Sequence, residues 1–282
     1  MLEEIAVIAA GAVAAFALAV VGILFCQGRR KPCTTGQYVA LGSSFAAGIG
    51  LGPRAPGSPF VCMRSTAGYP HLLARMMGLS LVDMTCSGST TEHILHGGQV
   101  FLGPQLAAVG PQTRLVTITS GGNDVRYIGD LMFASGSAGT IGKLFWRGPK
   151  PIGSRDFARV TDNFVRIIEA IRARAPAAKI VLVGYPAVMP AEGLCAGLRI
   201  DAKMVDLARA VAEKLDDATR AAAALSGALF VDMGALGAQH DACSAEPWIN
   251  GAAPAHGTAF HPTAAGAKAT AEAVFAALSY GS

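Results

Sequence analysis

The sequence predicts a three-layer α/β/α sandwich with a five-stranded parallel sheet, preceded by an N-terminal transmembrane helix. The chain has 282 residues, 52% of them hydrophobic and 15% charged, which allows one sizeable core and excludes a disordered chain. After Pro32, short β-branched runs alternate with segments of helical periodicity, a pattern typical of parallel strands joined by crossover helices. Residues 5–25 carry no charge and match the roughly 20 residues that a membrane-spanning helix needs.

The uncharged run at residues 5–25 indicates a membrane anchor or an uncleaved signal. A cleavable signal peptide has basic residues before a shorter apolar core, whereas here Glu3 and Glu4 precede a long one. We therefore expect residues 1–31 to serve as an anchor, and cleavage stays an open alternative.

The basic cluster at residues 29–31 lies directly after the apolar run. The positive-inside rule would place the C-terminal part of the chain in the cytoplasm, but the rule weakens for a large domain, so charge alone leaves the orientation open. Lipidation of Cys26 is disfavoured because Phe25 is bulky where lipidation signals need a small residue. We expect Cys26 and Cys33, in or beside the membrane segment, to play no part in the core.

One α/β domain over residues 36–282 is the economical interpretation. The expected strands are residues 37–41, 79–84, 114–119, 179–184 and 228–233. The expected helices are residues 69–77, 201–224, 263–278 and a segment with apolar positions at Phe157, Val160, Phe164, Ile167, Ile168 and Ile171. Because ligands of such folds bind at the carboxyl ends of the strands, the site is expected there.

The segment at residues 125–153 has no clear period and is long for a connection between a strand and a helix. It carries Phe133, Phe145 and Trp146 among glycines. Long segments of this kind are usually lids or binding loops.

The first expected strand ends in a Gly42-Ser43-Ser44 turn, which would expose a nucleophile to substrate. The G-x-S-x-G elbow of α/β-hydrolases is absent because Ala46 stands where its second glycine would be. No Walker A lysine is present after it, and the glycines of residues 48–52 do not fit the dinucleotide fingerprint.

Three further blocks come after later strands: Gly88 in a turn after the second, Asn123 after the third, and His261 before Pro262 at the last helix. Together with Ser44, these blocks resemble the SGNH hydrolases, the GDSL esterase and lipase family, over most of residues 37–279. The resemblance implies a flavodoxin-like fold with Ser44 as nucleophile and His261 as its base. It also implies an oxyanion hole made by the Ser44 and Gly88 amides and the Asn123 side chain.

These residue types supply the groups that acyl transfer needs: a hydroxyl, an imidazole that takes its proton, and donors for the oxyanion. Taken singly, each has a structural explanation as a turn, cap or helix-start residue, but four at strand ends are not expected by chance. Asp124 is interpreted as structural. His93 and His96 lie three apart without a third ligand, so we expect a surface pair and no metal.

Two positions depart from the family pattern. Ser43 stands where the family usually has an aspartate, and Thr258 stands three residues before His261, where it usually has the carboxylate partner of the base. Similarity to an actinobacterial-type branch implies a Ser-His dyad, with the main-chain carbonyl of Thr258 orienting the imidazole. Asp241 is the alternative carboxylate, and His256 is the alternative base.

Four cysteines lie within the domain, and the residues alone allow either disulfides or buried free thiols. The resemblance implies two bridges, Cys62 with Cys86 and Cys195 with Cys243. Disulfides require an oxidising compartment, so we expect an extracytoplasmic domain.

The sequence thus predicts a membrane-anchored serine esterase or lipase that cleaves carboxylic esters through an acyl-serine, without metal or organic cofactor. We expect the acyl chain of a small-molecule or lipid ester to contact residues 125–153. The net charge of only +4, with three charges at residues 29–31, disfavours a nucleic-acid partner. The alternatives are a carbohydrate O-deacetylase and an inactive lipid- or glycan-binding module; acyl length, alcohol group and oligomeric state stay open.

Overall fold

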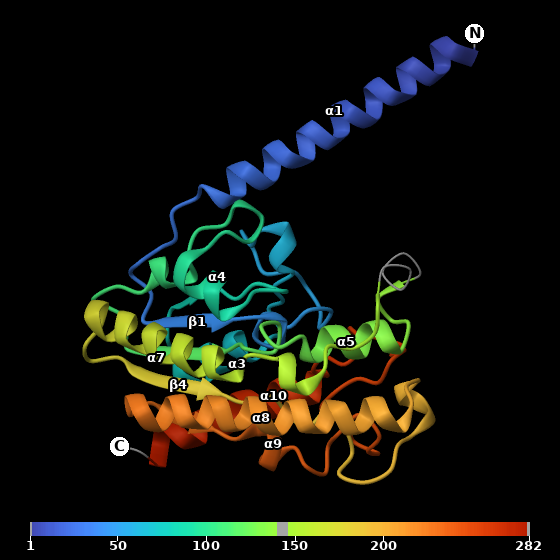
Figure 1. Cartoon of the computed structure of the whole chain (residues 1–282). Coiled ribbons are helices and arrows are strands. Elements are labelled where there is room, and N and C mark those ends of the chain that lie inside the picture. Colours follow the sequence, from blue (N-terminus) through green and yellow to red (C-terminus); the bar gives the residue numbers. More distant parts are fainter. Residues whose placement is uncertain (1, 140–145, 281–282) are drawn as a thin grey trace.

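The computed structural model describes residues 2–139 and 146–280, with a central parallel sheet between two layers of helices (Figure 1). The strands are β1 (Tyr38–Gly42), β2 (Leu81–Asp83), β3 (Leu115–Thr119), β4 (Lys179–Val183) and β5 (Leu229–Val231). They form one sheet in the order β2-β1-β3-β4-β5, with every neighbouring pair parallel. All five lie where the sequence predicts strands, and β1 lies inside the sheet between β2 and β3.

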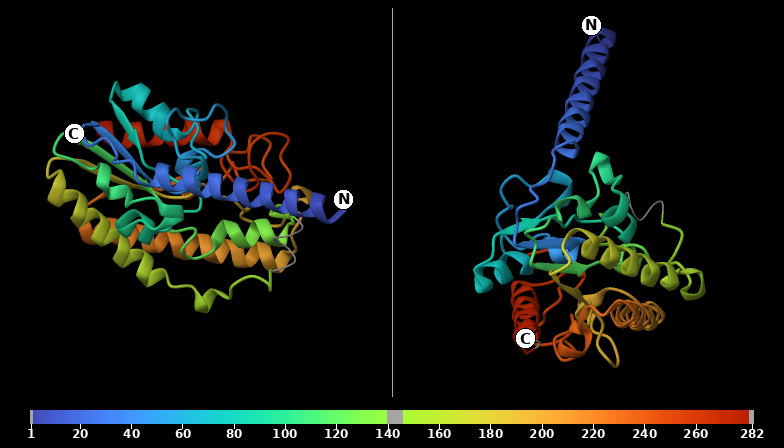
Figure 2. Two further views of the ribbon diagram at one scale, coloured as in Figure 1. Left: turned by 90° about the horizontal axis from the view of Figure 1, so that it is seen from above. Right: turned by 90° about the vertical axis from the view of Figure 1, so that its left-hand side faces the viewer.

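Alternate residues of the strands face the two helical layers. Val39 and Leu41 pack on one side with α4 (Thr91–His96), α7 (Phe157–Arg174) and α8 (Ala202–Ser226). Tyr38 and Ala40 pack on the other side with α3 (Tyr69–Met77) and α10 (Ala264–Tyr280). A parallel sheet covered on both faces reads as continuous hydrophobic runs, which is why the strands were recognisable in the sequence. Figure 2 shows the two layers on opposite sides of the sheet.

The four long helices of the domain confirm the predicted segments. Asp156 and Asp201 cap α7 and α8 by accepting backbone N–H groups of their first turns. Gly78 and Gly227 end α3 and α8 in the left-handed conformation, which costs glycine little. Short elements complete the chain: α2 (Ser44–Ala47), α9 (Met233–Leu236), η1 (Phe60–Cys62), η2 (Gln99–Phe101), η3 (Gln105–Ala108) and η5 (Ala196–Leu198).

The sequence predicts an irregular segment at residues 125–153, and this prediction was wrong for the first part of the segment. Residues there form the helix α5 (Tyr127–Ala134), and the short helix η4 (Ile152–Ser154) lies at the end of the segment. The helix is short and apolar on most sides, so it has no readable period. Its Asp130 is fully buried and pairs with Arg155 at 2.8 Å, which ties the two ends of the segment together. Phe145 lies outside the described residues.

The N-terminal helix α1 (Leu2–Gly28) projects away from the domain (Figures 1 and 2). The helical segment at residues 11–28 is long and apolar enough to cross a membrane. None of that span is buried against the rest of the protein. The helix therefore contributes nothing to the sheet domain's core.

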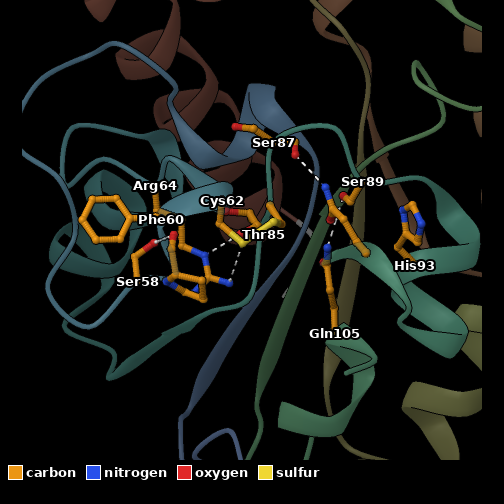
Figure 3. Close-up of a disulfide and its surroundings, with 12 residues drawn as sticks. Ser58, Phe60, Cys62, Arg64, Thr85, Ser87, Ser89, His93 and Gln105 are labelled. Carbon is orange, nitrogen blue, oxygen red and sulfur yellow. Dashed lines mark hydrogen bonds between the residues drawn. A yellow bond between two sulfur atoms is a disulfide. The ribbon is translucent and has the colours of Figure 1, made fainter. Parts of the chain in front are cut away.

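Two disulfides cross-link the domain, and both match the predicted pairs. Cys62 bonds to Cys86, and Cys195 bonds to Cys243 (the first is drawn in Figure 3). Such bridges persist in oxidising compartments, so they indicate an extracytoplasmic domain. Cys26 is a free, exposed thiol, as is Cys33.

Removing the Cys195–Cys243 bridge should destabilise the domain without touching the site. The bonded residues are 48 positions apart, and closing a loop of that length removes chain entropy worth about 4 kcal/mol from the unfolded state. We expect the Cys195→Ala/Cys243→Ala variant to lose about 3–4 kcal/mol in urea unfolding. Unchanged stability, or free thiols at these positions in non-reducing peptide mapping, would contradict this account.

Candidate active site

The turn after β1 carries Ser44 at the carboxyl edge of the sheet. Gly42 adopts a φ of 137°, and a Cβ there would lie 2.3 Å from the carbonyl oxygen of Thr119 on β3. Only glycine tolerates both conditions. The Ser43 N–H then donates to that Thr119 carbonyl at 2.9 Å, so the chain turns sharply and Ser44 begins α2.

His261 lies against this turn, although it is 217 positions away in the sequence. Its Nε2 lies 2.8 Å from Ser44 Oγ, and its Nδ1 lies 2.7 Å from the carbonyl oxygen of Ala259. A carbonyl only accepts, so Nδ1 carries the proton and Nε2 is the acceptor for the serine hydroxyl. Both side chains are buried. The arrangement is that of a nucleophile paired with its base.

The carbonyl that orients the imidazole belongs to Ala259, so the prediction of Thr258 was wrong by one residue. The Thr258 carbonyl instead accepts the His261 backbone N–H at 3.2 Å and Asn250 Nδ2 at 3.2 Å. Phe260 has a φ of 55°, which forms a tight turn in front of the histidine. In this turn the Ala259 carbonyl, rather than that of Thr258, bonds to the ring.

Neither alternative partner reaches the site. Asp241 Oδ1 accepts the backbone N–H of Cys243 at 2.7 Å, while both ring nitrogens of His261 are engaged by Ser44 and Ala259. His256 is exposed. The geometry is therefore a Ser-His pair oriented by a neutral carbonyl.

Burial keeps the imidazole neutral. Desolvation lowers the pKa of His261 to about 4, and the hydrogen bond to Ala259 opposes this only in part. The ring of Phe45 lies 5.2 Å from the imidazole, centroid to centroid, and contributes to its dry surroundings. At neutral pH the group is thus able to accept a proton.

The other two predicted residues, Gly88 and Asn123, line one pocket of about 240 Å³ together with Ser44 and His261. Gly88 has a φ of 82°, a conformation that favours glycine. Asn123 Nδ2 donates to the carbonyl of Ser89 at 2.8 Å, which fixes the amide. The remaining lining includes the apolar side chains of Phe45, Ile49, Met63, Ile128 and Met132.

Gln105 supports the site and was missed by the sequence reasoning. Its Oε1 accepts the Gly42 N–H at 2.8 Å, and its Nε2 donates to the Gly42 carbonyl at 3.0 Å. The same Nε2 lies 3.2 Å from Ser89 Oγ (Figure 3). This buried amide joins the turn after β1 to the turn after β2, and nothing in its local sequence distinguishes it.

Tyr185 was also missed. Its hydroxyl accepts the Gly122 N–H at 3.1 Å and lies 3.3 Å from Ser43 Oγ. Burial raises the pKa of Tyr185 to about 12, so the phenol stays protonated. Asp124 accepts the backbone N–H of Thr91 at the start of α4, which agrees with its structural interpretation.

The two neighbouring histidines have local partners. His93 Nδ1 accepts the Thr90 N–H at 3.1 Å in a capping box, and His96 Nε2 lies 3.8 Å from Glu92 Oε2. Within residues 2–139 and 146–280, no group of three or more His, Cys, Asp or Glu side chains could hold a metal ion.

This chain is similar in sequence and in fold to known proteins. Residues 40–269 match the model of the GDSL-like Lipase/Acylhydrolase family. Lipase 2 of Streptomyces coelicolor is 37% identical over 247 residues, covering 84% of this chain and 83% of that protein. The extracellular lipase of Streptomyces rimosus is 31% identical with a TM-score of 0.68, covering 85% of this chain and 98% of the other. Phospholipase A1 of Streptomyces albidoflavus NA297 is 24% identical, also with a TM-score of 0.68, covering 87% and 99%.

The matched region contains β2 to β5, the last three residues of β1 and the four predicted site residues. The curated relative is named a lipase, and its alignment covers most of both proteins. The chain therefore belongs to the GDSL-like lipase/acylhydrolase family, the SGNH hydrolases, and is an ester-hydrolysing enzyme.

Proposed function

We propose that Ser44 and His261 form a catalytic dyad that hydrolyses carboxylic esters through an acyl-serine intermediate. The observation that carries the proposal is the 2.8 Å contact between Ser44 Oγ and His261 Nε2 while Nδ1 is held by a carbonyl. That tautomer leaves Nε2 as the acceptor that a serine nucleophile needs.

The reaction begins when Ser44 Oγ attacks the ester carbonyl carbon and its proton passes to His261 Nε2. The tetrahedral oxyanion accepts hydrogen bonds from the Ser44 and Gly88 amides and from Asn123 Nδ2, each worth about 3–4 kcal/mol in the transition state. His261 then returns the proton to the leaving alkoxide, and water attacks the acyl-serine by the same route.

The base works without a carboxylate. A carboxylate would stabilise the imidazolium that forms during attack, whereas the Ala259 carbonyl offers only a dipole. The carbonyl still fixes the ring orientation and tautomer. We therefore infer a dyad with weaker electrostatic help than a triad.

The substrate is an ester with an apolar acyl chain, taken from solution or from a lipid. Support comes from the apolar side chains around Ser44, including Ile128 and Met132 of α5 in the segment that the sequence singled out for this role. A carbohydrate O-deacetylase would need polar groups for its sugar. An inactive binding module is disfavoured by the intact Ser44–His261 pair.

The enzyme is anchored through residues 5–25, with the domain of residues 36–282 outside the cytoplasm. The exposed, apolar span of α1 supports the anchor, and the two disulfides support the location. The family needs no metal or organic cofactor for this chemistry.

Replacing Ser44 by alanine should lower kcat by about 10³-fold or more, because the nucleophile is lost. Ser43→Ala is the matched control, and should cost far less because, within the described residues, its hydroxyl forms a hydrogen bond only with Tyr185 and none with His261. Assays with p-nitrophenyl esters from acetate to palmitate, beside acetylated xylan, would measure both variants. Equal effects, or deacetylation of xylan alone, would contradict the proposal.

In the pH profile of kcat/KM, the midpoint of the acid limb should lie near pH 4. His261 acts as a base only when neutral, so activity is present above its pKa and is lost as pH falls through about 4. A soluble ester assayed from about pH 3.5 to 8, with circular dichroism to follow folding, measures the limb. Loss of activity near the ordinary histidine value of about 6.5, with the fold intact, would refute a desolvated base.

Asp241→Asn should leave kcat almost unchanged, because its carboxylate serves the Cys243 amide and not the base. His261→Ala, in contrast, should abolish turnover. If Asp241→Asn instead lowered kcat by about 10⁴-fold in a folded protein, as loss of a triad carboxylate does, a hidden triad would replace the dyad.

A further inference from the structure

Two loops at the base of α1 expose large apolar side chains. Phe60 is 64% exposed in one loop, and Val100 and Phe101 are 41% and 52% exposed in the other. Both loops contact the last turns of α1. The Phe60 N–H donates to Gln27 Oε1 at 3.0 Å, and the Phe101 ring lies edge-on to Phe25 with centroids 5.8 Å apart.

The backbone of the second loop is held in an uncommon conformation. Val100 and Phe101 have φ values of 45° and 67°, a region that bulky and β-branched residues rarely adopt. The end of α1 approaches this loop closely, since a Cβ on Gly28 would lie 2.3 Å from the Phe101 carbonyl oxygen. Strained residues persist where the surrounding structure over-determines them and often mark functional surfaces.

Basic side chains lie beside Phe60 and directly after α1. Arg29, Arg30 and Lys31 come directly after α1, and none pairs with an acidic side chain in the part of the chain that the structure describes. The Arg54 guanidinium stacks on the Phe60 ring at 4.1 Å. Arg30, Lys31 and Arg54 border a hollow of about 650 Å³, whose one carboxylate, Asp83, is engaged by Arg64 and His71.

We propose that this juxtamembrane surface, formed by Phe60, Val100, Phe101, residues 29–31 and Arg54, lies on an anionic lipid bilayer. The inference rests on the membrane anchor proposed above. The apolar run of α1 ends at Phe25, so the bilayer boundary falls in the last turn of the helix, which both loops contact. Aromatic rings at this depth and cations beside them match the headgroup region of a membrane with acidic lipids.

The surface adjoins the catalytic pocket, which gives the contact a consequence for catalysis. Met63, one turn beyond Phe60, lines the pocket around Ser44. Gln99, next to Val100, donates from Nε2 to the Ser87 carbonyl at 2.7 Å, beside Gly88. Figure 3 shows the Phe60 loop and the Ser87–Ser89 turn on either side of the Cys62–Cys86 bridge. A bilayer on this surface would present its esters close to the pocket.

Quenching by nitroxide lipids tests, independently of enzyme activity, whether the juxtamembrane surface contacts the bilayer. The full chain, carrying Cys26→Ser and Cys33→Ser, would be labelled at Phe101→Cys with a fluorophore and reconstituted in phosphatidylcholine–phosphatidylglycerol vesicles containing nitroxide lipid. The matched control is Leu236→Cys, because Leu236 is 55% exposed on α9, at the far side from α1 (Figure 1). We expect quenching at position 101 and none at 236. Equal fluorescence at both positions would overturn the proposal.

Kinetics in the same vesicles provide a second readout. Phe60→Ser/Phe101→Ser should lower hydrolysis of a vesicle-embedded long-chain ester about tenfold, the factor that corresponds to burying roughly one phenyl ring. A water-soluble short-chain ester should change less than twofold, and Leu236→Ser should affect neither. An equal loss on both esters would overturn the inference. If the unmodified enzyme cleaved neither ester while position 101 was quenched, the esterase proposal would fail and the surface would stand.

Discussion

The hydrogen bond between Ser44 and His261 depends on the parallel sheet, and most of the supporting structure serves it. The serine comes directly after the interior strand β1, and the histidine precedes the last helix, 217 positions later. A parallel sheet places the carboxyl ends of all its strands at one edge, so residues this far apart can meet there. The His261 segment is fastened by the Asn250 N–H, which donates to the His261 carbonyl at 2.9 Å.

A neutral carbonyl in place of a carboxylate changes the electrostatics of the base. The Ala259 oxygen fixes the tautomer, but burial dominates and lowers the pKa of His261 to about 4. The imidazole is therefore neutral over the whole physiological range. In the proposed mechanism this neutral imidazole accepts the serine proton, and the imidazolium that forms is compensated by the negative charge of the oxyanion.

The turns that carry the proposed oxyanion donors are held by neutral hydrogen-bonding side chains. Gln105 joins the Gly42 backbone to Ser89, and Tyr185 holds the Gly122 N–H next to Asn123. Where related enzymes usually place an aspartate, Ser43 lies against the Tyr185 hydroxyl. Buried polar groups that are fully paired keep a catalytic geometry rigid, because any movement would leave one of them unsatisfied.

The amino-acid sequence was sufficient to predict the sheet, its helices, both disulfide pairs and the residues that meet at the site. Strands and long helices are periodic along the chain, and Ser44, Gly88, Asn123 and His261 stand in motifs that a linear sequence displays. Three-dimensional packing alone decided the rest. The choice of the Ala259 carbonyl results from a turn at Phe260 whose φ of 55° no local propensity predicts, and the supporting role of Gln105 arises from contacts with residues distant in sequence. Helix α5 was not predicted from the sequence for a related reason. Its eight residues are mostly apolar and are buried on several sides, so they show no helical period, and the helix is stabilised by packing against residues distant in sequence.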